Sequence, residues 1–532
     1  MTHRLWLSAS AAVAGAVVLS LGTAPVSGQG RFGDLADGPY ERLVIRNAMV
    51  VPGHGGPPAG PYDIVIRKNV IEEMTPFDPV TAQRQGAVER ASGDRVIDAT
   101  GLYVMPGMLD LHIHLRQDPM ELEYVYYLSL AHGVTTVVPA PDRGLPSAMD
   151  EARRSERNEI LAPRMYPIWG WGRDTDFSRE ELEDPAQTPR IARAMAERGA
   201  HVVSVGSLGW NPELFGAVCR AVWDAGGITT VHLPPSTNAV VNAVDAARLG
   251  VTMIEHHYGY PEASLPRRTQ DYPRDYDFNN ENHRFREAGR VWLEADRERL
   301  LTEVAQALVD ANATMIPTRN AYEMNRDMLR SMSHPWHAKY THQALLDWSA
   351  PNPANHASFH YNWTNDDEYM WTYAYNLWAE LIFQFNKRGG RVAYATDHNY
   401  MYQTPGFANI RELQLVRESG MHNLEVLKSA TFNSAQTLRQ PKLGLVRPGY
   451  LADLILVDGN PAENLYYLYS FGAVRMNDKQ QMYRTRGIVH TIKDGIVTNN
   501  ARLMEEVARM VANSRKKATS NFMTAPFQPG RS

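Results

Sequence analysis

Alternation of strand-like and helix-like segments over most of the chain limits the folds that this sequence is able to adopt. Short apolar runs with extended character are separated by helix-like runs such as 121–131, 245–249 and 301–311. This pattern is typical of repeated βα units with parallel strands. Eight units close a (β/α)8 barrel, also called a TIM barrel. The predicted barrel strands are 107–114, 134–139, 164–170, 201–207, 228–232, 252–256, 314–317 and 391–397.

Both ends of the chain read as β-structure instead. Alternating apolar and polar residues predict strands near the N-terminus and again near the C-terminus. Neither segment alone is long enough to bury a sheet face, so we expect one small β-sandwich built from both ends. The predicted strands are 43–51, 62–74 and 96–99 at one end, and 452–457, 472–476 and 489–493 at the other. The predicted division is a signal peptide at 1–28, the N-terminal part of the sandwich at 29–100, the barrel at 101–440, the C-terminal part of the sandwich at 441–500, and a C-terminal helix and tail at 501–532.

The first residues have the layout of a secretory signal peptide. Arg4 gives a positive start, 5–21 is apolar and uncharged, and Val26-Ser27-Gly28 offers a cleavage site of small residues. The alternative is an uncleaved anchor, for which the run lies at the short end of the spanning range of about 17–25 residues. We favour cleavage and expect an exported protein, periplasmic or secreted. Since no second apolar stretch of spanning length follows, no membrane association is expected after cleavage.

The composition of the chain limits the kinds of partner that the protein is expected to bind. Lys plus Arg is 54 and Asp plus Glu is 59, giving a net charge of −5. This balance argues against a nucleic-acid partner, which would require a basic face. We expect a small-molecule or short peptide-like substrate, and a homo-oligomer is left open. Cys219 is the only cysteine, so no intrachain disulfide forms, and its helix-like surroundings favour a buried core thiol over a nucleophile.

Histidines at strand ends carry the strongest chemical signal. His112 and His114 are two residues apart on a strand, so they project to the same side and enter the barrel mouth. Two neutral imidazoles at this spacing are able to share a metal at ~2.0–2.1 Å. A lone pair of this kind usually means two unrelated histidines. Here His232, His256 and Asp397 end three later strands, which favours a shared metal site.

These motifs follow one another along the chain in the order found in the amidohydrolase superfamily. The chain therefore resembles that superfamily, near its imidazolonepropionase-like and prolidase-like branches. The resemblance implies a metal site formed by His112, His114, His232, His256 and Asp397. It spans nearly the whole chain after the leader. The matching segments are Asn47-Ala48, 106–114, 133–136, 230–232, 250–256, 395–397, 430–435, 449–454 and 457–461.

One position departs from the family pattern. Binuclear members carry a lysine on the fourth barrel strand that is carbamylated to bridge two metals, and Ser204 occupies that position here. A serine hydroxyl does not supply a bridging carboxylate. The resemblance to mononuclear members therefore implies one divalent metal, with zinc as the expected ion, held by His112, His114, His232 and Asp397. A bridge from elsewhere, such as a carboxylate of a long loop, is left open.

The expected reaction is hydrolysis of a C–N bond in an amide, peptide-like or cyclic amide substrate by a metal-activated water. Asp397 is the predicted general base and then acid, and His256 the predicted stabiliser of the oxyanion. Substrate contacts are predicted for His256 and for Arg319, Asn320 and Tyr322, which follow the seventh strand. Glu255, His257 and His398 are interpreted as structural neighbours of the site.

Two alternatives to this function are left open. An ester, lactone or phosphotriester hydrolase would use the same site, and a non-catalytic binding protein would carry a decayed barrel. Two connections, 257–294 and 318–370, are much longer than usual for a barrel. The second is rich in Trp and His, which is consistent with a hydrophobic lid or with a packed insertion.

Overall fold

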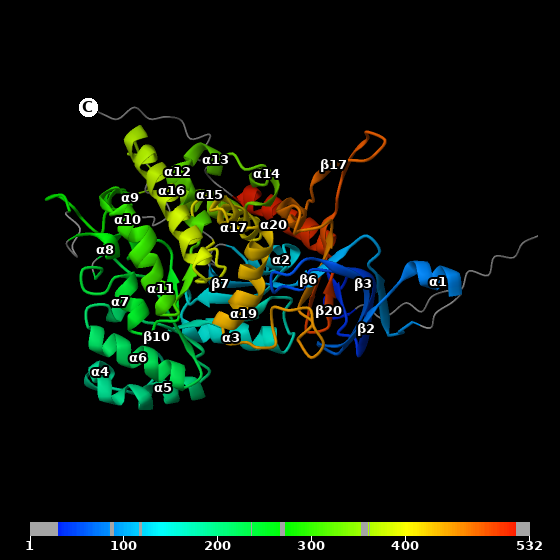
Figure 1. Cartoon of the computed structure of the whole chain (residues 1–532), viewed down its shortest axis with the longest axis horizontal. Coiled ribbons are helices and arrows are strands. Elements are labelled where there is room, and N and C mark those ends of the chain that lie inside the picture. Colours follow the sequence, from blue (N-terminus) through cyan, green and yellow to red (C-terminus); the bar gives the residue numbers. More distant parts are fainter. Residues whose placement is uncertain are drawn as a thin grey trace, which may run out of the picture.

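A computed structural model describes residues 30–85, 90–115, 120–235, 237–266, 272–352, 360, 362–398 and 400–517. The predicted signal peptide and the end of the predicted tail lie outside these residues. Figure 1 shows a helix-covered barrel on one side and a β-sheet domain beside it, with the long helix α20 between them. In the part of the chain that the structure describes, no helix combines the length and apolar character needed to cross a membrane.

The sheet beside the barrel is built from both ends of the chain, which confirms the predicted β-sandwich domain. Strand β1 pairs with β20, and β16 lies between β6 and β19, so the three C-terminal strands lie side by side with N-terminal strands on both sides of them. Leu43, Ile64, Val104 and Leu454 are buried in its core. The strands are β1 (Ala36–Asp37), β2 (Arg42–Val50), β3 (Ala59–Arg67), β4 (Val70–Pro76), β5 (Arg95–Asp98), β6 (Tyr103–Pro106), β16 (Leu454–Asp458), β19 (Gly487–Lys493) and β20 (Ile496–Thr498).

One predicted sandwich strand lies elsewhere. Strand β17 (Val474–Met476) pairs with β18 (Met482–Arg484) in a separate two-stranded hairpin, which stands away from the sheet (Figure 1). Met476 and Met482 are exposed, so the alternation that predicted a buried strand here reflects a solvent-exposed hairpin. The prediction that 472–476 belongs to the sandwich was therefore wrong.

Eight parallel strand positions form the barrel, as predicted. The third strand is split into β9 and β10 around Pro167, which has no N–H to donate. The barrel closes where Leu111 N donates to Tyr394 O at 3.0 Å and Asp397 N donates to His112 O at 2.8 Å. The strands are β7 (Met108–His114), β8 (Val134–Ala140), β9 (Arg164–Met165), β10 (Ile168–Gly170), β11 (Val202–Ser204), β12 (Ile228–Val231), β13 (Met253–Glu255), β14 (Thr314–Ile316) and β15 (Arg391–Val392).

Helices cover the outside of the barrel. Helix α6 begins after Asn211, whose side chain accepts a hydrogen bond from Leu214 N, and it buries Cys219. Burial raises the pKa of the Cys219 thiol to about 12, as expected for a core thiol. The outer helices are α2 (Leu122–Ala131), α3 (Leu145–Glu156), α4 (Arg179–Glu183), α5 (Thr188–Glu197), α6 (Pro212–Asp224), α7 (Ala243–Arg248), α10 (Arg297–Arg299), α11 (Ala305–Asp310), α16 (Asn365–Lys387), α17 (Phe407–Glu418), α18 (Asn423–Lys428) and α19 (Ser434–Thr437).

The two long connections are helical insertions. The first contains α8 (Tyr260–Ser264) and α9 (Glu281–Glu294), and the second contains several short helices. Trp336 stacks on Phe407 with ring centres 5.0 Å apart, and Trp371 is almost completely buried. The described part of the Trp-rich segment is thus packed into the molecule. Its helices are η4 (Arg319–Tyr322), α12 (Glu323–Arg326), α13 (Met328–Met332), α14 (His337–Tyr340) and α15 (Gln343–Ser349).

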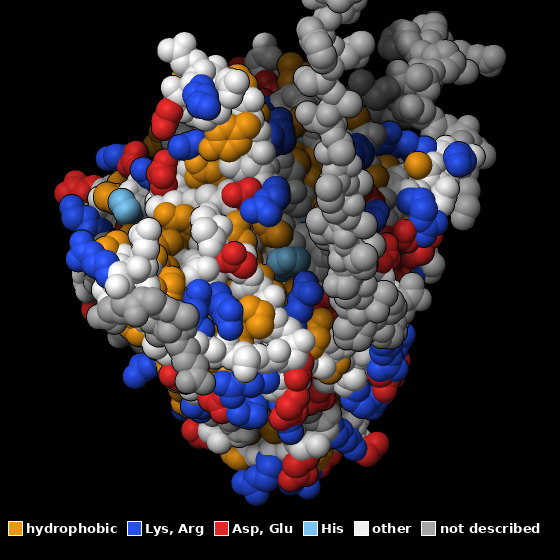
Figure 2. All heavy atoms as spheres, turned by 90° about the vertical axis from the view of Figure 1, so that its right-hand side faces the viewer, with side chains coloured by type: hydrophobic (Ala, Val, Ile, Leu, Met, Phe, Trp, Pro, Cys, Tyr) orange, Lys and Arg blue, Asp and Glu red, His pale blue; other side chains and the backbone are white. Residues whose placement is uncertain are grey.

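Helix α20 (Asn500–Lys517) joins the two parts of the molecule. Leu503, Val507 and Val511 are buried, and the helix contacts both α2 of the barrel and β19 of the sheet. At its basic end, Arg515 donates to the carbonyl of His337 at 2.6 Å. Figure 2 shows the face at the sheet end, where acidic and basic side chains are interspersed and hydrophobic side chains form small separate groups.

Candidate functional site

A cavity of about 730 Å³ opens at the ends of the barrel strands. Its lining includes the five residues predicted to form the metal site: His112, His114, His232, His256 and Asp397. These residues come from strand positions that are separated by up to almost 300 residues in the chain, and the barrel brings them to one face. The structure therefore brings together all the residues predicted for this site.

Left-handed backbone shapes the cavity wall. His256, Thr318 and Asp397 each have positive φ, at 62°, 50° and 53°. Such conformations are uncommon for residues with a side chain and cluster at functional sites. Because His256 breaks the strand alternation, Glu255 and His256 both line the cavity. Nδ1 of His256 lies 2.7 Å from the Thr318 hydroxyl, which fixes the imidazole ring.

The imidazoles of His112 and His114 converge on one carboxylate oxygen. Oδ1 of Asp397 lies 3.4 Å from His112 Nε2 and 3.0 Å from His114 Nε2. On their other side, His112 Nδ1 lies 3.1 Å from Glu255 Oε1 and His114 Nδ1 lies 2.8 Å from Asp142 Oδ1. Each ring is thus held by a carboxylate at Nδ1 and presents Nε2 to the same point, which is how metal-binding histidines are commonly oriented.

The carboxylates and histidines of the site strongly influence one another's pKa. Burial lowers the pKa of His112, but the carboxylates of Glu255 and Asp397 outweigh burial and hold that pKa well above its usual value. Burial raises the pKa of Asp397, but His256, His112 and His114 hold it well below its usual range. The carboxylate is therefore ionised, and the two histidines attract either protons or a cation. Metal binding would displace a proton from His112, since only a neutral nitrogen coordinates.

The donor set fits a divalent metal. Among the described residues, two groups place three ligand atoms within 4.8 Å of one another: His112, His114 and Asp397, and His112, Glu255 and His256. Imidazole nitrogens with a carboxylate suit zinc and similar ions. Ser204 lies at the cavity wall, where it offers only a hydroxyl. Glu255, at the end of β13 and not in a long loop, places a further carboxylate beside these histidines. The number of metal ions that the site holds stays a prediction.

His232 lies somewhat apart from these two groups. Its ring centre is 4.8 Å from that of His256 and 5.0 Å from that of Tyr258. Burial, assisted by the nearby His256, lowers the pKa of His232 to about 3, so the ring is neutral at physiological pH. A neutral imidazole on the cavity wall is able to coordinate, but its role as a fourth ligand remains a prediction.

Asp110 fixes the segment that carries Asp397. Its carboxylate accepts hydrogen bonds from Thr396 N at 3.0 Å, from Thr396 Oγ1 at 2.5 Å and from Asn409 Nδ2 at 2.7 Å. Burial raises the pKa of Asp110 to about 7. The residue preceding Asp397 is therefore tied to the strand that carries His112 and His114, which keeps the three side chains in register.

The four predicted substrate contacts divide into two pairs. His256 and Tyr322 line the cavity, whereas Arg319 and Asn320 lie behind the wall. Arg319 Nη1 donates to Leu415 O at 3.0 Å, and its guanidinium lies 4.1 Å from the Tyr375 ring centre. Asn320 Nδ2 donates to Thr396 O at 2.8 Å. The predicted substrate contact of Arg319 and Asn320 thus has no counterpart in the structure.

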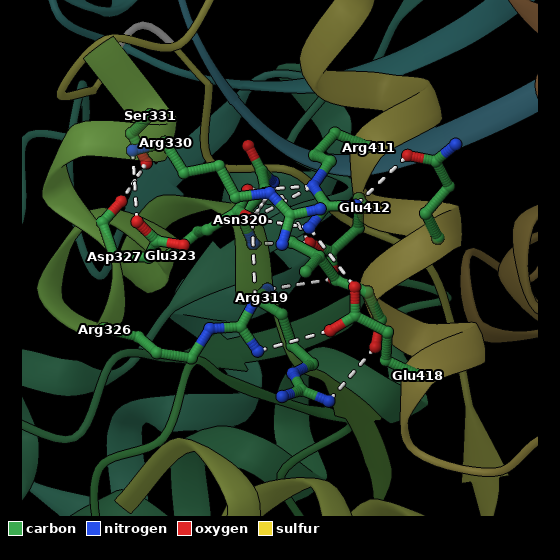
Figure 3. A network of polar contacts seen from close by, with 12 residues as sticks. Arg319, Asn320, Glu323, Arg326, Asp327, Arg330, Ser331, Arg411, Glu412 and Glu418 are labelled. Atoms are coloured by element: carbon green, nitrogen blue, oxygen red, sulfur yellow. Dashed lines mark hydrogen bonds and ion pairs between the residues drawn. The ribbon is translucent and has the colours of Figure 1, made fainter. Parts of the chain in front are cut away.

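Figure 3 shows the network that holds these two residues. Glu412 of α17 accepts hydrogen bonds from the backbone N–H groups of Arg319 and Asn320, at 2.9 and 2.7 Å. Close by, Glu323 pairs with Arg411, whose Nε lies 2.9 Å from Oε2. The network anchors the segment after β14 to α17, so the polar residues that follow this strand are largely structural.

Sequence reasoning missed two of the carboxylates in the site. Asp142 follows β8 at the barrel mouth, and this strand-end position was a signal that could have singled it out. Glu255 was interpreted as structural, but it lines the cavity because the left-handed backbone of His256 breaks the rule that neighbours on a strand face opposite sides. The same rule holds for His257, which lies in an aromatic pocket with Trp371 at 5.3 Å and Trp378 at 5.5 Å between ring centres.

Comparison with known proteins agrees with this architecture. Residues 384–497 match the sequence profile of the Amidohydrolase family. A Xaa-Pro dipeptidase structure with bound methionine superimposes with a TM-score of 0.54 at 18% identity, covering 86% of this chain and 100% of the other. Residues 384–497 therefore belong to the Amidohydrolase family, and the described chain has the fold of an amidohydrolase. A bottromycin amidohydrolase is similar with a TM-score of 0.59 at 15% identity, covering 90% of this chain and 91% of the other.

Sequence comparison adds a further relative of low identity. An adenine deaminase from Geobacillus kaustophilus is 22% identical over 407 residues, covering 74% of this chain. This chain spans only 53% of that relative. The comparisons thus assign residues 384–497 to the family and establish the fold, and the substrate has to be inferred from the site itself.

Proposed function

We propose that this amidohydrolase is a metal-dependent hydrolase of C–N bonds in amides, peptide-like compounds or cyclic amides. A Xaa-Pro dipeptidase and a bottromycin amidohydrolase are among its structural neighbours, and peptide and amide bonds are C–N bonds. The cavity is large enough for a small-molecule or short peptide-like substrate, since ligand pockets commonly enclose about 300–1,000 Å³.

One observation carries the proposal. His112 and His114 present Nε2 to Oδ1 of Asp397 at 3.4 and 3.0 Å. Their Nδ1 atoms are held by Glu255 and Asp142 at 3.1 and 2.8 Å. A decayed barrel would have no reason to keep both orienting carboxylates together with the three converging donors, and this argues against a purely non-catalytic role.

His112, His114 and Asp397 would hold a divalent ion, which would supply a Lewis acid for activating water and polarising a carbonyl group. Asp397 is ionised, so it is able to accept a proton and later return it to the leaving nitrogen. Burial lowers the pKa of His256, and the ring is therefore neutral. If Nδ1 accepts the Thr318 hydroxyl proton, Nε2 carries the proton and is able to donate to the developing oxyanion.

The test is metal analysis of the purified protein followed by a hydrolase screen with and without chelator. We expect about one zinc or similar ion per chain, turnover of at least one amide, dipeptide or cyclic amide, and loss of that turnover in chelator with recovery on adding metal. Turnover of esters, lactones or phosphotriesters alone would favour the alternative hydrolase. A metal-free protein without any turnover would overturn the proposal.

A further inference from the structure

Helix α9 of the first insertion contributes a basic residue to the cavity. Arg284 and Phe285 line the same space as His112, His114 and Asp397. The insertion replaces an ordinary short barrel loop, so this arginine reaches the cavity from outside the barrel strands. The carboxylates of the metal group and the guanidinium of Arg284 give the cavity two regions of opposite charge.

Arg284 has unused hydrogen-bonding capacity. Its Nε atom is buried and has no acceptor among the residues that the structure describes. Glu281 Oε1 lies 3.5 Å from Nη1, which is a long contact, and the arginine side chain is only 16% exposed. Because buried donors are nearly always satisfied, an unsatisfied guanidinium nitrogen beside a cavity indicates a missing acceptor.

Phenol groups surround this guanidinium. Tyr258, Tyr322 and Tyr400 line the same cavity. The buried Tyr258 hydroxyl has no acceptor for its own proton among the described residues, although the Tyr322 hydroxyl is placed to donate to it. A phenol has an ordinary pKa of about 10. The hydroxyl therefore stays protonated and is able to donate. A guanidinium and a phenol that both lack acceptors form a receptor for an anionic oxygen acid.

The charge balance favours a carboxylate over a phosphate. The guanidinium fork matches either group geometrically. Glu281 offsets part of the positive charge of Arg284, and a doubly charged phosphate would also be repelled by Glu255 and Asp397 elsewhere in the cavity. A monoanion is the better match for a single, partly compensated cation.

We propose that Arg284, together with Tyr258, binds a carboxylate of the substrate. The inference rests on the proposed function, and it narrows the substrate class to carboxylate-bearing amides such as N-acyl amino acids and short peptides. Arg284 is then a specificity-determining residue. It holds the carboxylate of the substrate while the C–N bond of the substrate lies near Asp397.

The binding test uses ligands without a hydrolysable bond. Metal-loaded protein is titrated calorimetrically with 3-phenylpropanoate, 3-phenylpropanol and 3-phenylpropyl phosphate. We expect the carboxylate to bind most tightly. In Arg284→Gln its affinity falls about 10- to 100-fold, the range for a hydrogen bond to a charged group, and the affinity for the alcohol is unchanged. The matched control is Arg290→Gln on the same helix, because Arg290 pairs with Glu287 and Glu294 and does not line the cavity.

Turnover provides a second readout. N-acetyl-L-leucine, N-acetyl-L-phenylalanine and N-acetyl-L-proline are compared with their C-terminal carboxamides, and Arg284→Gln should lose kcat/KM for the acids only. A carboxylate affinity that survives in Arg284→Gln, or tighter binding of the phosphate than of the carboxylate, would overturn the inference. Carboxylate binding that depends on Arg284, without hydrolysis of any amide, would leave this subsite standing and overturn the proposed function instead.

Discussion

Asp397 belongs to the proposed metal site and is also the proposed acceptor of a proton during hydrolysis. Its Oδ1 faces His112 and His114, and its Oδ2 lies 3.7 Å from His256 Nδ1. The two oxygens therefore face different neighbours, and substitution is able to separate binding from proton transfer.

Asp397→Asn keeps the size of the side chain and an oxygen that is able to face the ion, but the amide cannot accept a proton at neutral pH. We expect turnover to fall by about 10²–10⁴-fold while the protein stays folded and holds part of its metal. His112→Ala should instead deplete the metal. The measurements are turnover, metal content and melting temperature of both variants. Near-normal turnover of a folded, metal-loaded Asp397→Asn variant would contradict the assigned role.

A second test concerns Glu255. Its Oε1 contacts His112 Nδ1, and Glu255 also belongs to the second group of possible ligands, with His112 and His256. Glu255→Gln should weaken metal binding by about 10- to 100-fold, as expected when an orienting carboxylate is lost. Competition with a chromophoric chelator measures the affinity, and the exposed Glu197→Gln serves as control. If wild type holds two ions and the variant one, Glu255 is itself a ligand and the single-metal prediction fails.

For single residues, the sequence predicts features that a local pattern determines, and it does not predict contacts between residues far apart in the chain. A histidine at a strand end is visible locally, so His112, His114, His232 and His256 could be proposed from the sequence. The partners of their second nitrogens depend on which strands become neighbours and on a positive φ at His256. Neither property is written in the local pattern, so the contacts of Asp142 and Glu255 with these histidines could not be predicted, although the position of Asp142 after a strand was a local signal for that residue.

At the scale of elements, the barrel strands were predictable because each is a short, buried, apolar run. The hairpin β17–β18 was not, since an exposed hairpin with apolar residues has the same alternation as a half-buried strand. The insertions were visible only as long connections. Their helices, including the one that brings Arg284 to the cavity, depend on contacts with the rest of the molecule.

Helix α8 contains a buried carboxyl group that makes a pH-dependent contribution to stability. Glu262 accepts a hydrogen bond from Asn238 Nδ2 at 2.7 Å, and burial raises its pKa from 4.5 to about 7. Between these two values the folded state binds more protons than the unfolded state, so this group makes stability fall as pH rises. Below the unfolded value both states are protonated, and above about pH 7 the loss is complete.

Glu262→Gln should therefore raise the melting temperature relative to wild type at pH 8. The difference should shrink as pH falls from 7 to 4.5 and vanish below that range, because glutamine imitates the protonated acid. Melting curves of both proteins across pH 4 to 8 test this expectation. A difference that is independent of pH would show that the carboxyl group is not protonated preferentially in the folded state.

At the scale of the whole molecule, the location of the protein depends on the fate of its first residues. We propose export with removal of about the first 28 residues, from the charged start, apolar run and small-residue site. Mass measurement of protein recovered from the periplasm or medium of the natural host should give a chain without its N-terminus. Recovery of the intact chain from a membrane fraction would show that the segment is an anchor.

The interleaving of N-terminal and C-terminal strands in one sheet imposes an order on biosynthesis. Strand β6 emerges more than 300 residues before β16, its partner across the sheet, and β1 waits still longer for β20. Until then the nascent chain exposes unpaired strand edges and the apolar face around Leu43 and Val104, a state prone to aggregation. Such a chain should depend on chaperones during synthesis, and a nonsense mutation shortly before residue 454 should yield insoluble protein even though the barrel segment would be complete.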